Sequence, residues 1–195
     1  MKSMITTTLT AASAVFFLAA TAAQSQEIQE RKENQQDRIA EGVQSGELTA
    51  GETARLEGKE SSLNQEERDM RQLDNGKLTT SDRKTLNQQQ NKLSGQIYQD
   101  KHNAYTQGAG KGEIGQRKEN QQDRIAQGIK SGQLTAGETA NLEHKESALN
   151  HEEHNMRQLD NGKLTGQDRK TLNHQQNKLS KQIYTKKHNS RTQPK

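Results

Sequence analysis

The sequence predicts an all-α protein made of two tandem three-helix modules with a sparse core. A shift of 86 positions aligns residues 31–106 with residues 117–192, and 58 of these 76 pairs are identical. Each copy contains two turns that are followed by a helix-start pattern. The few apolar residues recur at helical spacing between these turns. Together these observations predict a duplicated helical unit.

The first helix of each copy is expected over about residues 29–44 and again 86 residues later. Its apolar residues are Ile28, Ile39 and Val43, and it ends before the turn dipeptide Ser45-Gly46. Polar Gln35 and Gln36 precede Ile39, as Gln89 and Gln90 precede Leu93 further along. A hydrogen-bonded glutamine layer is one interpretation, and the expectation we favour is loose, partly solvated packing.

The second and third helices are expected over about 50–73 and 80–103. Leu56, Leu63 and Met70 follow one another at intervals of seven, which is typical of a narrow coiled-coil stripe. The third helix has Leu86, Leu93 and Ile97. Threonine with an acidic residue three positions later predicts a capping box at four helix starts. These pairs are Thr49/Glu52, Thr79/Asp82, Thr135/Glu138 and Thr165/Asp168.

The extent of the two copies and the expected helix ranges divide the chain into four predicted segments. Residues 1–23 form a signal peptide, 27–107 the first module, 108–112 a flexible glycine-rich linker, and 113–193 the second module. The first module carries a net charge of −3 and the second +4. Self-association through oppositely charged modules is therefore a hypothesis, and salt would screen it.

The N-terminal segment predicts export. Lys2 precedes an apolar stretch from Ala11 to Ala20, and Ala20-Thr21-Ala22 resembles a cleavage site, so we expect cleavage after Ala22 or Ala23. The stretch is too short for a membrane span, so none is expected after signal removal. The absence of cysteine excludes disulfides, zinc–thiolate sites and a cysteine nucleophile. A periplasmic or secreted location is predicted.

Composition limits the functions that the chain can have. Only 26% of residues are hydrophobic and 3% aromatic, and beyond residue 23 Leu, Ile, Val and Phe make up about 13%. We find no catalytic constellation, and we interpret the acidic residues as solvated helix charge, so no enzyme activity is predicted. The basic C-terminal residues lack stacking aromatics, so no nucleic-acid partner is expected.

Metal binding is the remaining chemical hypothesis. Residues 46–52 resemble the second half of an EF-hand loop, but Val43 stands where that loop needs an oxygen ligand. The weak metal candidates are His144, His151 and His154, which have spacing suited to a transition metal but are expected on the solvent side of their helix. No confident metal site and no cofactor are predicted.

The pattern from Asn34-Gln35-Gln36 through both Leu-Thr turns to Ile97-Tyr98 and Lys101-His102-Asn103 resembles small exported bacterial helical repeat proteins of unknown function. That resemblance implies no activity. Leu48-Thr49 and Leu78-Thr79 are more loosely similar to the L-T-x-x-Q motifs of periplasmic helical chaperones, although Glu52 and Asp82 replace the glutamine.

We therefore expect an exported, non-catalytic binding or structural protein of the bacterial envelope, whose protein or envelope partner is unknown. One alternative is a periplasmic chaperone or stress-type binder of unfolded proteins. The other is a degenerate EF-hand-like or histidine-dependent metal-binding protein.

Overall fold

The computed structural model describes residues 12–108 and 112–193, with side chains from residue 26 on. Most of the predicted linker and the first 11 residues of the predicted signal peptide lie outside the described residues. The described part is all-α, with six helices and no strand, so the predicted fold class is confirmed. The helices are α1 (Ala12–Ser45), α2 (Ala50–Leu73), α3 (Thr80–Lys101), α4 (Glu113–Lys130), α5 (Ala136–Leu159) and α6 (Gly166–Lys187).

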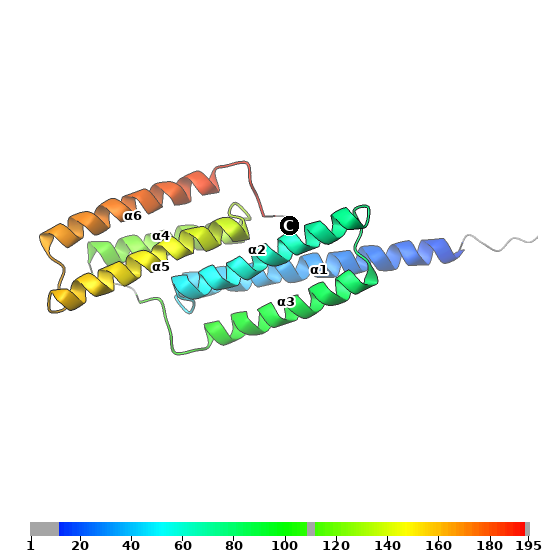
Figure 1. Ribbon diagram of the computed structural model, residues 1–195, viewed down its shortest axis with the longest axis horizontal. Coiled ribbons are helices and arrows are strands. Elements are labelled where there is room, and N and C mark those ends of the chain that lie inside the picture. Colours follow the sequence, from blue (N-terminus) through cyan, green and yellow to red (C-terminus); the bar gives the residue numbers. More distant parts are fainter. Residues whose placement is uncertain (1–11, 109–111, 194–195) are drawn as a thin grey trace, which may run out of the picture.

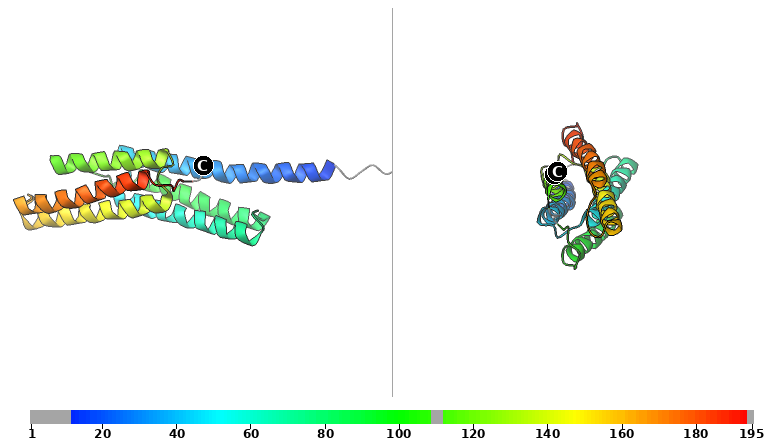
Figure 2. Two further views of the ribbon diagram at one scale, coloured as in Figure 1. Left: turned by 90° about the horizontal axis from the view of Figure 1, so that it is seen from above. Right: turned by 90° about the vertical axis from the view of Figure 1, so that its left-hand side faces the viewer.

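The helices form two three-helix groups that pack against each other (Figure 1). Helices α1–α3 make the first group and α4–α6 the second. The most extensive helix contact joins α2 to α5, and the next joins α1 to α4, so both leading contacts run between the groups. Figure 2 shows α1 continuing well beyond the packed region toward its N-terminal end.

The turns follow the local chemistry expected from the sequence. Gly46, Gly76 and their counterparts Gly132 and Gly162 adopt positive φ angles, as do Asn75 and Asn161. A capping box is present at Thr49/Glu52, Thr79/Asp82, Thr135/Glu138 and Thr165/Asp168. Each helix after a turn therefore starts with its first amide groups satisfied.

We expect Thr49→Ala to lower the free energy of unfolding by about 1 kcal/mol, because the Thr49 hydroxyl accepts a hydrogen bond from the Glu52 amide at 3.3 Å. Thr80→Ala is the matched control, since Thr80 is exposed and its counterpart is Gly166. Urea denaturation followed by circular dichroism measures both. Equal losses in the two variants would contradict the capping role.

One apolar core runs through both groups. Ile39, Leu56 and Ile97 of the first group belong to the same buried cluster as Ile125, Leu142 and Ile183 of the second. Of the 18 positions that differ between residues 31–106 and 117–192, only the pair Val43/Ile129 is buried. Divergence between the copies is therefore confined almost entirely to exposed or half-buried positions, and the packing is shared.

Candidate functional site

The contact between the two groups contains a buried polar stripe beside the apolar one. On α2 it consists of Thr53, Glu57, Glu60, Asn64 and Glu67, which recur at alternating intervals of four and three and so share one helix face. On α5 the buried members are Thr139, Glu143, Glu146 and Glu153. The interpretation of the acidic residues as solvated helix charge is therefore wrong for these glutamates.

Glu57 and Glu143 lie at the centre of this stripe, and both are 0% exposed. Gln36 of α1 donates a hydrogen bond to one carboxylate oxygen of Glu57 at 3.1 Å, and Gln122 of α4 does the same for Glu143. The other carboxylate oxygen of each has no hydrogen-bond partner among the described residues. This half-satisfied arrangement favours the protonated carboxylic acid, which needs less solvation than the ion.

Burial sets the protonation of this pair. Desolvation raises the pKa of Glu57 well above its usual range, and the nearby charges of Glu60 and Glu143 raise it further. Desolvation likewise raises the pKa of Glu143 to about 8. Because Glu57 belongs to α2 and Glu143 to α5, the carboxyl groups influence each other across the contact between the groups.

Glu60 and Glu146 are the next residues along the stripe. Both are 0% exposed, and within the described part of the chain neither oxygen of either carboxylate has a hydrogen-bond partner. Burial raises the pKa of each to about 7, although Lys32 or Lys118 partly offsets the effect. Glu60, Glu146 and Glu143 can therefore take up and release protons near neutral pH. We call these three residues and Glu57 the central carboxylates.

A buried ion pair flanks the central carboxylates in each group. Lys32 pairs with Glu67, and Lys118 pairs with Glu153. Arg71 also approaches Glu67 at 2.8 Å. Burial raises the pKa of Glu67, but the hydrogen bonds and charges of Lys32 and Arg71 outweigh it and lower the pKa below its usual value. Glu67 thus remains a carboxylate close to the protonated acids.

Glutamines fill the space between α1 and α3. Gln35 is 2% exposed and donates to the Gln90 carbonyl at 2.7 Å and to the Ser94 hydroxyl at 2.8 Å. Gln90 in turn donates to the Ile28 carbonyl. The expected loose, partly solvated packing is wrong here: because the side-chain nitrogens of Gln35 and Gln90 find acceptors inside the bundle, the layer can be buried.

A groove of about 560 Å³ runs between α2 and α3 beside the module contact. Leu63, Leu93 and Ala54 form its apolar floor, although each is largely buried in the core. Gly58 lies against it, and a Cβ added there would meet no described atom of another helix within 4 Å. The charged lining residues are Arg55, Lys59, Lys92 and Glu66, and His144 reaches the groove from α5. This groove is suited to an apolar group that carries a negative charge.

The histidines do not converge. His144, His151 and His154 lie on α5 and are exposed, and His174 is exposed on α6. Over residues 12–108 and 112–193 no group of three His, Cys, Asp or Glu residues is placed to hold a metal ion. The EF-hand-like segment 46–52 and the weaker match at residues 75–82 lie at opposite ends of α2, which has 24 residues.

The sequence did not predict the central carboxylates, because in a highly charged helix a buried glutamate and an exposed one have the same sequence surroundings. One signal in the sequence points to them: Glu57, Glu60, Gln36 and Lys32 are each identical in the second copy. Neighbouring surface positions differ, such as Gly58 and His144. The polar stripe also repeats with the apolar stripe: Glu57 and Asn64 directly follow Leu56 and Leu63, at the same interval of seven residues.

Neither a family model, nor a curated protein, nor a solved structure matches this chain. In the described part of the chain, no helix is long and apolar enough to cross a membrane.

Proposed function

We propose that this protein is an exported, non-catalytic binding protein of the bacterial envelope, and that its ligand occupies the groove between α2 and α3. The observation that carries the proposal is the apolar surface of this groove beside a rim with three cationic side chains, Arg55, Lys59 and Lys92. An apolar group with a neighbouring carboxylate or sulfonate satisfies both features.

The pattern of differences between the two copies supports a binding role for the first module, since two purely structural units would not need different grooves. Buried positions are shared between the copies, whereas the groove differs at Gly58, whose counterpart is His144. A histidine at position 58 would extend into the open groove. Glycine at position 58 therefore keeps open a space in the first module that the histidine of the second copy would fill.

We expect Gly58→His to weaken binding of 8-anilinonaphthalene-1-sulfonate, a probe with apolar rings and one negative charge, by at least about fivefold. The variant is expected to fold, because His144 is accommodated at the equivalent place on α5. Fluorescence titration of the full chain measures the affinity, and circular dichroism checks the helix content.

Gln88→His is the matched control. It also copies a second-module residue, His174, but position 88 is exposed and does not line the groove. Its affinity should equal that of the parent. Unchanged dye affinity in Gly58→His, or an equal loss of affinity in both variants, would contradict the assignment of the binding site to this groove.

A second candidate function is the binding of unfolded proteins, which the apolar floor of this groove favours, formed by the largely buried Leu63 and Leu93. Suppression of aggregation of a denatured test protein at near-equal ratios, weakened in Gly58→His, supports this function. Dye binding without suppression leaves the first proposal and removes the second.

A further inference from the structure

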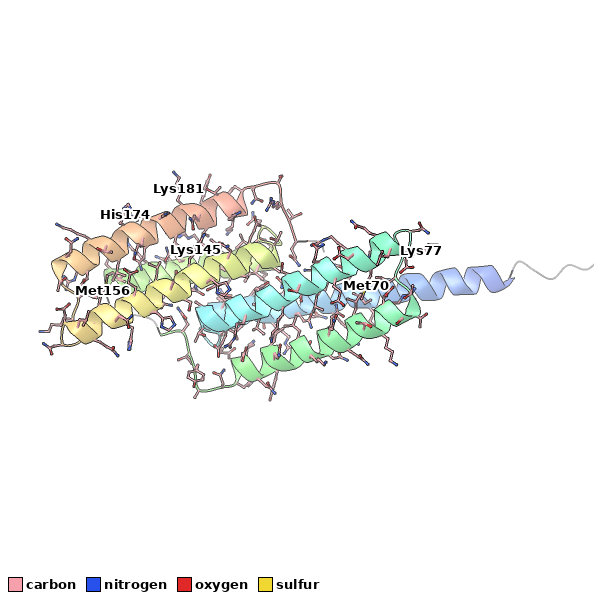
Figure 3. The ribbon with its side chains drawn as sticks, in the orientation of Figure 1. Met70, Lys77, Lys145, Met156, His174 and Lys181 are labelled. Atoms are coloured by element: carbon pink, nitrogen blue, oxygen red, sulfur yellow. The ribbon has the colours of Figure 1, made fainter. Side chains whose placement is uncertain are left out.

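A second groove, between α5 and α6, differs in character from the first. It has a volume of about 440 Å³. Its cationic lining residues are all lysines: Lys145, Lys178, Lys181 and Lys186. Among the described residues that line it, the one acidic side chain is Glu138. Figure 3 places Lys145 on α5 and Lys181 on α6 in the second module. We call this the lysine groove.

Little of this positive charge is neutralised within the described part of the protein. Lys186 lies 3.4 Å from Glu138, but Glu138 also accepts hydrogen bonds from Asn189 and from Thr135. Lys145 donates to the neutral Gln182 side chain at 3.0 Å. Lys178 and Lys181 are exposed and have no ion pair among the described residues. Most of the lysine charge therefore faces solvent.

The first module carries only part of this charge: Lys59 and Lys92 match Lys145 and Lys178, whereas Lys181 and Lys186 have no lysine counterpart. Gly95 and Asp100 stand where the second module has Lys181 and Lys186, and Arg55 stands where it has Asn141. Asp100 approaches Arg55 at 3.7 Å, so an internal ion pair offsets part of the positive charge in the first module. The second module has replaced the pair and added two cations. Because these positions are not core positions, stability does not require the change.

We propose that the lysine groove binds a linear polymer of phosphate groups. Lysine ammonium groups bind phosphate as point charges, so a row of lysines with little internal pairing suits a chain of successive phosphates. Lys178 and Lys186 stand eight positions apart on α6, about 12 Å at 1.5 Å per residue, with Lys181 between them, and this length suits several successive phosphates. The described lining of this groove has no aromatic side chain on which a nucleic-acid base could stack.

The proposal is tested with the full chain and inorganic polyphosphate, by fluorescence anisotropy across a salt series. Lys181→Gly combined with Lys186→Asp installs the residues of the first module. We expect at least a tenfold loss of affinity and a shallower dependence on salt, because fewer counterions are released. Thermal unfolding of the variant checks that it remains folded.

The control removes the same charge elsewhere, with Lys163→Gln and Lys77→Glu at exposed positions outside the lysine groove. It should retain most of the affinity. The reverse change, Gly95→Lys with Asp100→Lys and Arg55→Asn, should add binding in the first module. These two results would support the proposal.

Three outcomes would overturn it: an equal loss in the control, tighter binding of a carboxylated polysaccharide or of single-stranded DNA than of polyphosphate, and binding of anionic vesicles without binding of the soluble polymer. Lys181→Gly with Lys186→Asp changes no residue that lines the groove between α2 and α3, so its result can be told apart from that of Gly58→His.

Discussion

Glu60→Gln is expected to raise the free energy of unfolding at pH 8 by about 2–3 kcal/mol relative to the parent protein. Glu60 is fully buried, and neither of its carboxylate oxygens has a hydrogen-bond partner among the described residues. At pH 8 the parent must hold this group as a buried ion. Glutamine has nearly the same shape and no charge, so it removes that cost.

The pH dependence has a definite sign. The pKa of Glu60 is about 7 in the folded protein and about 4.5 in the unfolded chain, so the folded state binds the extra proton. Stability therefore falls as pH rises from about 4.5 through 7, and it levels off above that range. Glu146 behaves alike, and Glu143, with a pKa of about 8, extends the decline to higher pH.

Urea denaturation at pH 5, 6.5 and 8 measures these effects. The parent should be less stable at pH 8 than at pH 5, and Glu60→Gln should make that decline smaller. Glu33→Gln is the control, because Glu33 is exposed on α1 and should leave the pH profile unchanged. A parent protein that gains stability between pH 5 and pH 8 would contradict the assignment of the central carboxylates.

Much of the fold could be predicted from sequence because its signals are local. Turn glycines and threonine caps depend on residues within one helical turn, which is why α2 and α5 start at Ala50 and Ala136, as the capping boxes indicate. The contact between the groups has no such signal. It depends on which face of α2 meets α5, and this is decided by packing between residues far apart in the chain.

The candidate site was hidden for the same reason. Glu57 becomes a buried acid only because α5 covers it and Gln36 of α1 supplies one hydrogen bond. Neither neighbour is close in sequence. The histidines illustrate the opposite case: His151 and His154 lie on the exposed face that their spacing from Leu149 predicts, because helix periodicity alone decides this.

Loss of the buried ion pair is expected to have an effect of similar size and opposite direction. Lys32→Met keeps an unbranched apolar stem but leaves Glu67 buried with Arg71 as its remaining cationic partner among the described residues. We expect the free energy of unfolding at pH 7 to fall by about 3 kcal/mol, because an incompletely paired buried charge is costly. Lys32 also lowers the pKa of Glu60, so its removal makes the ionised form of Glu60 less favourable as well.

The pH profile separates this effect from simple loss of packing. The pKa of Glu67 is lowered in the folded protein, so its pairing contributes stability above its usual pKa, and that contribution is lost as pH falls. The difference between the parent and Lys32→Met should therefore shrink when pH is lowered below about 4.5, the usual pKa of Glu67, toward its lowered pKa in the folded protein. Arg31→Met is the control, because Arg31 forms a half-exposed pair with Glu27 that is worth at most about 1 kcal/mol. A difference between the parent and Lys32→Met that stays constant with pH would mean that Lys32 acts through its aliphatic stem, whereas a shrinking one assigns its contribution to the charges of Glu67 and Glu60.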